Sequence, residues 1–310
     1  MTRRTIACIG ECMIEMCKKS DVQYEMAFAG DTANTAIYLS RLLNSSHSSV
    51  DYVTALGNDP YSTQIYNFLN SENVCTTQIR RLDGEMPGIY FIETDNEGER
   101  SFYYYRSAAA AKKMFEGDRG EILLSNLSNY EWLYLSGISL SILDTNSLSK
   151  LIMALKKARD KGTKIVFDGN FRPAGWDSVK VAHRVFSQVL AVSYIALMTF
   201  ADEKAVFGDT SPENTVDRLR SLGVEEGAIK LGDKGCLVFD HLGEEFLPIS
   251  SKITMPVDTT AAGDSFNAGF LFSRMTGASI VEAGQYGNKL AGKVIQFQGA
   301  IVPKKDFLNF

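Results

Sequence analysis

Hydrophobic and polar residues follow one another along this chain in blocks that predict strands and helices in alternation. Apolar runs at residues 6–9 and 165–167, within expected strands at 5–9 and 164–168, are typical of strands buried on both faces. Segments with apolar residues every three or four positions, such as residues 32–43 and 148–161, are typical of amphipathic helices. By the same criteria we expect further strands at 52–56, 132–135, 194–198, 228–231 and 236–240, and further helices at 61–69, 179–189, 202–207, 215–222, 265–275 and 280–296.

This alternation predicts the fold class. Strands that alternate with helices of this length favour an α/β fold, in which helices cover both faces of a mostly parallel central sheet. Ligands of such folds lie beyond the carboxyl ends of the strands. No internal repeat or linker interrupts the chain, so we expect a single domain over residues 1–310.

A β-hairpin is predicted outside this alternation. Residues 89–94 and 100–105 are rich in β-forming side chains, and residues 95–98 supply turn chemistry between them. Because the hairpin precedes the regular alternation, we expect it to lie outside the main sheet. It would belong to a small β lid formed by segments near 11–30 and 86–106.

Composition narrows the class of protein. The chain has 310 residues, of which 45% are hydrophobic and 22% charged, and its net charge of −5 argues against a general nucleic-acid binder. Five cysteines without a Cys-x-x-Cys pair, and no secretory leader, are expected of a cytoplasmic protein. The longest apolar stretch, residues 189–200, is too short to span a membrane. The three histidines lack metal-ligand spacing.

The most informative segment is residues 258–264, which follow an expected strand end at 255–257. Small residues before a helix let the backbone N–H groups of residues 261–263 reach an anion, and the helix N-terminus adds partial positive charge. Asp264 could accept the proton of a substrate hydroxyl that attacks a phosphoryl group. The alternative is an ordinary strand–helix turn with a helix-capping aspartate.

The hairpin offers a candidate carboxylate site. Alternation along a strand places Tyr104 and Arg106 on one face, and Tyr90 on the opposing strand could lie over the same pocket. A phenol and a guanidinium together can hold a carboxylate, because arginine binds it through two parallel hydrogen bonds. The alternative is a packed aromatic strand that ends in a solvated arginine.

Two further segments have polar side chains where an α/β site is built. Asp168, Asn170 and Arg172 leave the end of a buried strand at alternate positions, although they could equally form a polar loop that closes on Pro173. The segment 230–235 joins two apolar strands and could be a simple hairpin turn. It is not a Walker A loop, which needs Gly-x-x-x-x-Gly-Lys-[Ser/Thr] before a helix.

The order of these segments resembles that of the ribokinase-like (PfkB) sugar kinases. The likeness rests on Gly30-Asp31 followed by Asn34, Asp-x-Asn-x-Arg at 168–172, Lys-x-Gly-x-x-Gly at 230–235, and Asp-Thr-x-x-Ala-Gly-Asp at 258–264. The chain departs from the family pattern where Asp31 and Ala261 each replace a glycine, and where Thr199 and Asp202 stand in place of the asparagine and glutamate of many members. The resemblance implies a ribokinase-like three-layer sandwich with a mostly parallel central sheet and a small β lid.

The resemblance also implies roles for these residues. Asp264 would be the catalytic base, and Ala261, Ala262 and Gly263 would form the anion hole. Substrate-binding residues would be Gly30, Asp31, Asn34, Tyr90, Tyr104, Arg106, Arg172, Asp258 and Asp264. Cofactor-binding residues would be Asp168, which lies near magnesium or its waters, and Asn170, Arg172, Lys230, Gly232, Gly235 and Asn288, together with 261–263. Asp202 would act on magnesium through water, where many family members have glutamate.

Residues 9–15, the turn at 30–32, and residues 99–104 and 135–139 look, within the family, most like those of 2-keto-3-deoxygluconate kinases. That likeness implies transfer of a phosphoryl group from ATP, with Mg²⁺, to the C6 hydroxyl of this acidic sugar, and two arginines suit an acid. Neither nucleic acid nor membrane is an expected partner. By analogy with the family we expect a homo-oligomer. Dependence of the activity on a monovalent cation is left open. Two alternatives remain: a kinase for a neutral sugar such as fructose or ribose, and a non-catalytic sugar- or nucleotide-binding protein.

Overall fold

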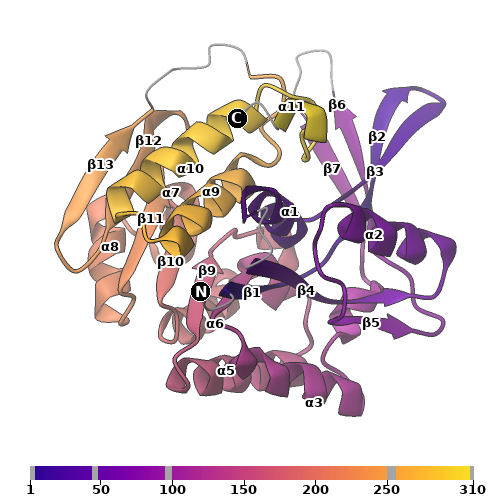
Figure 1. The fold of residues 1–310 in the computed structure, drawn as a ribbon, viewed down its shortest axis with the longest axis horizontal. Coiled ribbons are helices and arrows are strands. Elements are labelled where there is room, and N and C mark those ends of the chain that lie inside the picture. The colour runs from indigo at the N-terminus through magenta and orange to yellow at the C-terminus, as the bar shows by residue number, and fades with distance from the viewer. Residues whose placement is uncertain (1–3, 44–47, 95–99, 250–255, 308–310) are drawn as a thin grey trace.

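The computed structural model describes residues 4–43, 48–94, 100–249 and 256–307, and these residues form a large sheet and a small one (Figure 1). The large sheet has nine strands among these residues; all neighbouring pairs from β11 to β5 are parallel, whereas β12 pairs antiparallel with both β11 and β13. In spatial order its strands are β13 (Glu244–Pro248), β12 (Gly235–Phe239), β11 (Glu226–Lys230), β10 (Ile195–Thr199), β9 (Lys164–Asp168), β8 (Trp132–Ser136), β1 (Arg4–Ile9), β4 (Ser48–Gly57) and β5 (Ile79–Leu82).

Helices cover both faces of this sheet, as the alternation predicts. One face carries α1 (Asp31–Leu43), α2 (Pro60–Ser71), α9 (Ala262–Thr276) and α10 (Ile280–Val294). The other carries α3 (Gly117–Asn126), α5 (Thr145–Asp160), α6 (Val179–Leu190), α7 (Phe200–Phe207) and α8 (Pro212–Ser221). Strand residues alternate between the two cores: Ile6 and Cys8 belong to the first, Ala7 and Ile9 to the second. Shorter helices are α4 (Gly137–Ser141) and α11 (Lys304–Phe307).

The small sheet is formed by the segments that were predicted to make a lid, and we call it the lid. It contains β3 (Gln23–Ala29), β2 (Met13–Ser20), β6 (Ile89–Thr94) and β7 (Arg100–Tyr105), in that order. The predicted hairpin is confirmed, with Tyr90 opposite Tyr104, while its turn at 95–98 lies outside the described residues. A small core of Met13, Tyr90 and Ile92 holds the lid together. The lid stands apart from the main sheet and leans over its edge (Figure 1).

Several predictions of elements need correction. Helix α9 begins at Ala262 and not at residue 265, so Asp264 lies inside its first turn. Pro256 and Val257 belong to no strand, because the Val257 N–H donates to the carbonyl of Ile295 at the end of α10. Residue 255 lies outside the described residues. The pattern did not predict β5, β13, α3, α4 or α11, which are short or largely polar.

Candidate active site

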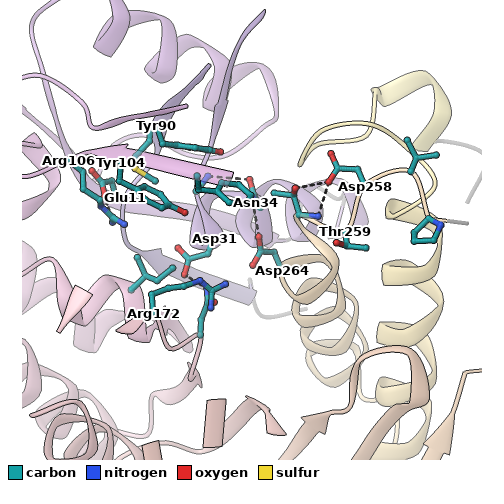
Figure 2. A pocket seen from close by; sticks show the side chains of 18 residues that line it. Glu11, Asp31, Asn34, Tyr90, Tyr104, Arg106, Arg172, Asp258, Thr259 and Asp264 are labelled. Carbon is teal, nitrogen blue, oxygen red and sulfur yellow. Dashed lines mark hydrogen bonds and ion pairs between the residues drawn. The ribbon is translucent and has the colours of Figure 1, made fainter. Parts of the chain in front are cut away.

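A cavity of about 720 Å³ opens between the lid and the main sheet (Figure 2). Its walls come from the loops after β1 and β9, the N-terminal turns of α1 and α9, and the lid. Figure 2 shows Asn34 and Asp264 facing each other at its centre, with the lid residues on one side and Asp258 and Thr259 on the other. The predicted residues that line it are Gly30, Asp31, Asn34, Tyr90, Tyr104, Arg106, Asn170, Arg172, Asp258 and Asp264.

Residues 261–264, which we call the anion turn, start helix α9 at the cavity. Ala261 is the N-cap with φ −110°, so this position does not need the glycine of the family pattern. The N–H of Ala262 donates to the carbonyl of Thr259 at 3.2 Å. Helix geometry leaves the next two N–H groups, of Gly263 and Asp264, without partners inside the helix. These two donors, together with the helix dipole, suit an anion.

Asp264 is buried beside these donors. Its carboxylate Oδ2 accepts a hydrogen bond of 2.8 Å from the side-chain amide of Asn34. Burial is the main reason that the pKa of Asp264 is raised well above its ordinary value, and the neighbouring carboxylate of Asp31 adds to this effect. The hydrogen bond from Asn34 and the charge of Lys230 oppose it. A carboxylate with a raised pKa is a stronger proton acceptor, which suits a general base.

The loop before α1 brings a second carboxylate to the cavity. Gly30 is required there, since a Cβ on it would lie 2.0 Å from the carbonyl of Glu11. Asp31 accepts a 2.8 Å hydrogen bond from the side chain of Asn170, whose backbone has φ +32°. Burial raises the pKa of Asp31, and hydrogen bonds from Ser136 and Asn170 oppose this rise. Asp31, the predicted sugar contact, and Asn170, the predicted phosphate contact, are therefore joined by a hydrogen bond.

The lid wall contains an ion pair that the sequence analysis did not predict. Arg106 donates to the carboxylate of Glu11, which is only 3% exposed and directly follows Gly10. Burial raises the pKa of Glu11, and Arg106 opposes the rise. The guanidinium carbon of Arg106 lies 5.9 Å from the ring centre of Tyr104. An acidic residue just beyond the first buried strand was the available signal for Glu11.

The polar groups of Tyr90 and Asp258 are already hydrogen-bonded within the protein. Tyr90 lines the cavity, and its hydroxyl donates a hydrogen bond to Glu15. Asp258 accepts from the N–H of Thr260 at 2.9 Å and from that of Gly299 at 2.7 Å. Asp258 thus ties the segment before the anion turn to the chain after α10. Its role as a direct substrate contact stays a prediction.

Arg172 is the more available cation of the cavity. It is exposed, and its guanidinium donates to the carbonyl of Phe171, with no carboxylate partner among the described residues. Asp202 accepts from the Phe171 N–H at 3.1 Å, so α7 supports the loop that carries Arg172. Burial raises the pKa of Asp202, and the charge of Arg172 opposes this. The contact of Asp202 with magnesium stays a prediction.

Of the residues predicted to bind the nucleotide, Asn170 and Arg172 line this cavity, whereas the others, residues 261–263 included, do not. Gly232 and Gly235 have φ of +64° and +110°, and a Cβ on Gly235 would lie 2.1 Å from the carbonyl of Leu247. The amide of Asn288 donates to the same carbonyl at 3.3 Å. The side chain of Lys230 points to Asp168, at 3.1 Å. Their nucleotide roles stay predictions.

The residues present fit a magnesium ion carried by phosphates. No group of three or more acidic, histidine or cysteine side chains within the described ranges could hold a metal. Magnesium, however, keeps several waters and binds through one or two carboxylates plus substrate phosphates. The candidate carboxylates are Asp168, at the end of β9, and Asp202, in the first turn of α7 directly after the adjacent strand β10.

Comparison with known proteins agrees with this geometry. Residues 3–306 match the sequence profile described as pfkB family carbohydrate kinase. The chain belongs to the pfkB family of carbohydrate kinases. A pfkB-family relative, the 2-dehydro-3-deoxygluconokinase of Escherichia coli (strain K12), is 42% identical over 306 residues, which are 97% of this chain and 98% of that protein. The fructokinase of Vibrio alginolyticus is 26% identical over 84% of this chain and 81% of its own.

A solved structure shows the same fold. The aminoimidazole riboside kinase of Salmonella enterica, complexed with aminoimidazole riboside and an ATP analog, superposes with a TM-score of 0.83 at 22% identity and covers 99% of each chain. The ribokinase-like fold predicted from the order of segments is thereby confirmed, as is family membership. In the parts of the chain that the structure describes, no helix has the length and apolarity needed to cross a membrane.

Proposed function

We propose that this chain transfers the γ-phosphoryl group of ATP to the C6 hydroxyl of 2-keto-3-deoxygluconate, the substrate otherwise called 2-dehydro-3-deoxygluconate. The observation that carries the proposal is one cavity that holds a buried base, Asp264, and an exposed cation, Arg172. Asp264 would accept the proton of the C6 hydroxyl, and Arg172 would bind the carboxylate at the other end of the same sugar. The 42% identity to a kinase named for this sugar supports the same choice.

In the proposed reaction Asp264 accepts the proton of the attacking hydroxyl. Asn34 holds the carboxylate of Asp264 in place through the 2.8 Å hydrogen bond. The N–H groups of Gly263 and Asp264, with the helix dipole, stabilise the negative charge on the transferring phosphoryl group. Magnesium, when bound, would neutralise charge on the phosphates of ATP. Asp202 and Asp168 would hold it through its waters.

The carboxylate of the sugar would lie against Tyr104 and the two arginines. Arg172 offers a full positive charge, whereas Arg106 shares its charge with Glu11. Arg106 therefore acts as a fixed donor that Glu11 orients, and Arg172 supplies most of the electrostatic attraction. Gly30, Asp31 and Asn34 would contact the hydroxyls, with Tyr90 and Asp258 on the two walls.

The remaining predicted roles belong to this proposal. Lys230, Gly232, Gly235, Asn170 and Asn288 would contact ATP. The chain would act as one domain whose lid closes over the sugar and excludes water, a competing acceptor. We also propose a cytoplasmic homo-oligomer, and we leave dependence on a monovalent cation to direct assay.

One observation favours a second candidate, a kinase for a neutral sugar such as fructose. Glu11 neutralises Arg106, so the net charge that these two residues present to the sugar is about zero. A neutral hydroxyl could then replace the carboxylate at Arg106. The exposed charge of Arg172 argues for the acidic sugar, because a neutral sugar has no need of it.

The test is ATP- and Mg²⁺-dependent ADP release with 2-keto-3-deoxygluconate, gluconate, fructose and ribose, for the natural protein and for Arg172→Met. We expect the highest kcat/KM with the keto-deoxy acid, and a KM for it that rises about 10- to 100-fold in Arg172→Met. Arg184→Met, which removes a cation from helix α6 outside the cavity, is the control. A higher kcat/KM with fructose or ribose would favour the second candidate.

A further inference from the structure

Four buried polar side chains lie beneath the anion turn, and we call them the floor cluster. They are Tyr134 on β8, Asp168 on β9, Lys230 on β11 and Asn267 on α9, and none is more than 9% exposed. Asn267 follows Asp264 by three residues, which is close to one helical turn. The cluster therefore joins the helix that carries the base to three strands of the main sheet.

Asn267 is the centre of the cluster. Its amide nitrogen donates to the hydroxyl of Tyr134 at 2.9 Å and to the Oδ2 of Asp168 at 2.8 Å. Its amide oxygen accepts from the ammonium of Lys230 at 3.0 Å, and that ammonium also pairs with the Oδ1 of Asp168 at 3.1 Å. A buried network in which the polar groups are satisfied in this way is rigid, so these hydrogen bonds hold α9 in one position against the sheet.

The floor cluster also contacts the anion turn itself. The ammonium of Lys230 lies 3.7 Å from the position that a Cβ would take on Gly263. The hydroxyl of Thr35 lies 3.2 Å from the hydroxyl of Tyr134 and 3.2 Å from the carbonyl oxygen of Asp264. A displacement of the cluster would therefore move the backbone that carries the base.

The cluster contains one negative and one positive charge. The carboxylate of Asp168 raises the pKa of Asp264, and the ammonium of Lys230 lowers it. With both charges present, their effects on the pKa of Asp264 oppose each other. The other titratable groups that act on Asp264 from neighbouring elements are Asp31 and Tyr38 on α1 and Tyr134 on β8.

We propose that the floor cluster is a positioning unit for the base: Asn267 fixes the first turns of α9 against the sheet, and the Lys230–Asp168 pair keeps the charge beneath Asp264 balanced. The proposal rests on the proposed function for the role of Asp264. It assigns a task to Asn267, which no sequence motif singled out, and it gives Lys230 and Asp168 a task separate from their predicted contacts with nucleotide and magnesium.

The first test is the kinetics of Asn267→Leu, which keeps the volume of the side chain and removes its hydrogen bonds. Because misplacement of a catalytic group by about 1 Å can cost about 100-fold, we expect kcat to fall by about 100-fold. The KM for the sugar should change much less, since the cavity residues that bind it are untouched. An unchanged kcat would overturn the role of Asn267.

The second test follows the titration of Asp264 directly, by ¹³C NMR of carboxyl-labelled aspartate, with the resonance assigned from Asp264→Asn. Lys230→Met leaves Asp168 uncompensated, so the midpoint should rise by about 1 pH unit. Asp168→Asn leaves Lys230 uncompensated, so the midpoint should fall. The double variant should return close to the natural protein. Midpoints that move in the same direction in both single variants, or not at all, would overturn the charge balance.

The molecule supplies a matched control on the same two elements. Arg274, in the last turn of α9, pairs with Glu226, the first residue of β11, at 2.9 Å and 2.5 Å. Arg274→Met and Glu226→Gln break an ion pair between the same helix and strand at their far ends. We expect these variants to lower the unfolding temperature but leave the titration of Asp264 unchanged.

The proposed kinase function and the positioning role of the floor cluster can fail separately. The NMR titration needs no substrate, so a natural protein without activity on any sugar of the panel would contradict the proposed function alone. Loss of activity in Asn267→Leu together with an unfolding temperature like that of Arg274→Met would support positioning over general destabilisation. An Arg274→Met protein that loses kcat to the same extent would overturn it.

Discussion

The side-chain amide of Asn34 donates a 2.8 Å hydrogen bond to the carboxylate of Asp264, although 230 residues separate them in the chain. Asn34 lies in the first turn of α1 and Asp264 in the first turn of α9, and these helices pack side by side on one face of the main sheet. This contact places the first turn of α1 directly against the anion turn.

Replacement of the base should abolish turnover and spare nucleotide binding. Asp264→Asn keeps the shape of the side chain but cannot accept the proton, so kcat should fall by about 100- to 10,000-fold. ATP binding, measured by calorimetry, should change little, because the backbone donors of the turn remain. Asp118→Asn removes an exposed aspartate from the first turn of α3 and is the matched control. Near-normal turnover in Asp264→Asn would remove Asp264 as the base.

The activity should fall as the pH is lowered through the raised pKa of Asp264. Asp264 must be ionised to act, and burial raises its pKa, so kcat/KM should rise with pH through a midpoint above the ordinary aspartate value of 3.8. Asn34→Leu removes the hydrogen bond that favours the ionised form, so its midpoint should lie at higher pH. A profile of kcat/KM against pH for both proteins checks this. A lower midpoint in the variant would contradict the assignment of Asn34.

Arg106 should matter for acidic sugars and for folding at the same time. Arg106→Met removes a donor to the sugar carboxylate, so the KM for the acidic sugar should rise with little change in kcat. It also leaves Glu11 charged and buried, which costs about 3–5 kcal/mol of stability. The double variant with Glu11→Gln should regain most of that stability but keep the raised KM. Urea unfolding and initial-rate kinetics separate the two effects, and an unchanged KM in both variants would exclude Arg106 from the carboxylate site.

Glu203 should make stability depend on pH. One carboxylate oxygen of this fully buried residue is bonded to Arg218, and the other has no hydrogen-bond partner. Burial raises the pKa of Glu203 from 4.5 to about 7, although Arg218 opposes the rise. Because the folded pKa is raised, the protonated group favours folding below pH 4.5, and this contribution is lost as the pH rises through about 7.

Unfolding in urea at pH 5 and pH 8 measures this effect. Relative to Glu203→Gln, which cannot titrate, the natural protein should lose up to about 3 kcal/mol between the two pH values. Glu213→Gln, which changes an exposed glutamate in the first turn of α8, is the control. A difference between the natural protein and Glu203→Gln that is the same at both pH values would contradict the raised pKa.

The sequence by itself determined the order of most elements and the place of Asp264 at the start of a helix. The spacing of apolar residues predicted most strands and helices because buried faces must repeat with the period of each element. Small residues before a helix marked the anion turn, and alternation along β7 placed Tyr104 and Arg106 on the cavity side. These signals are local, since each depends on residues within about one or two turns of one another.

The tertiary structure alone decided which polar groups are partners. Glu11 pairs with Arg106, Asn170 with Asp31, and Lys230 with Asp168, and each pair joins segments far apart in the chain. A sequence shows the charge of each residue but not the packing that buries it, and burial is what raises the pKa of Asp264 and makes a partner necessary. For the same reason Asn267 gave no signal in the sequence. Its importance comes from three strands that end around it.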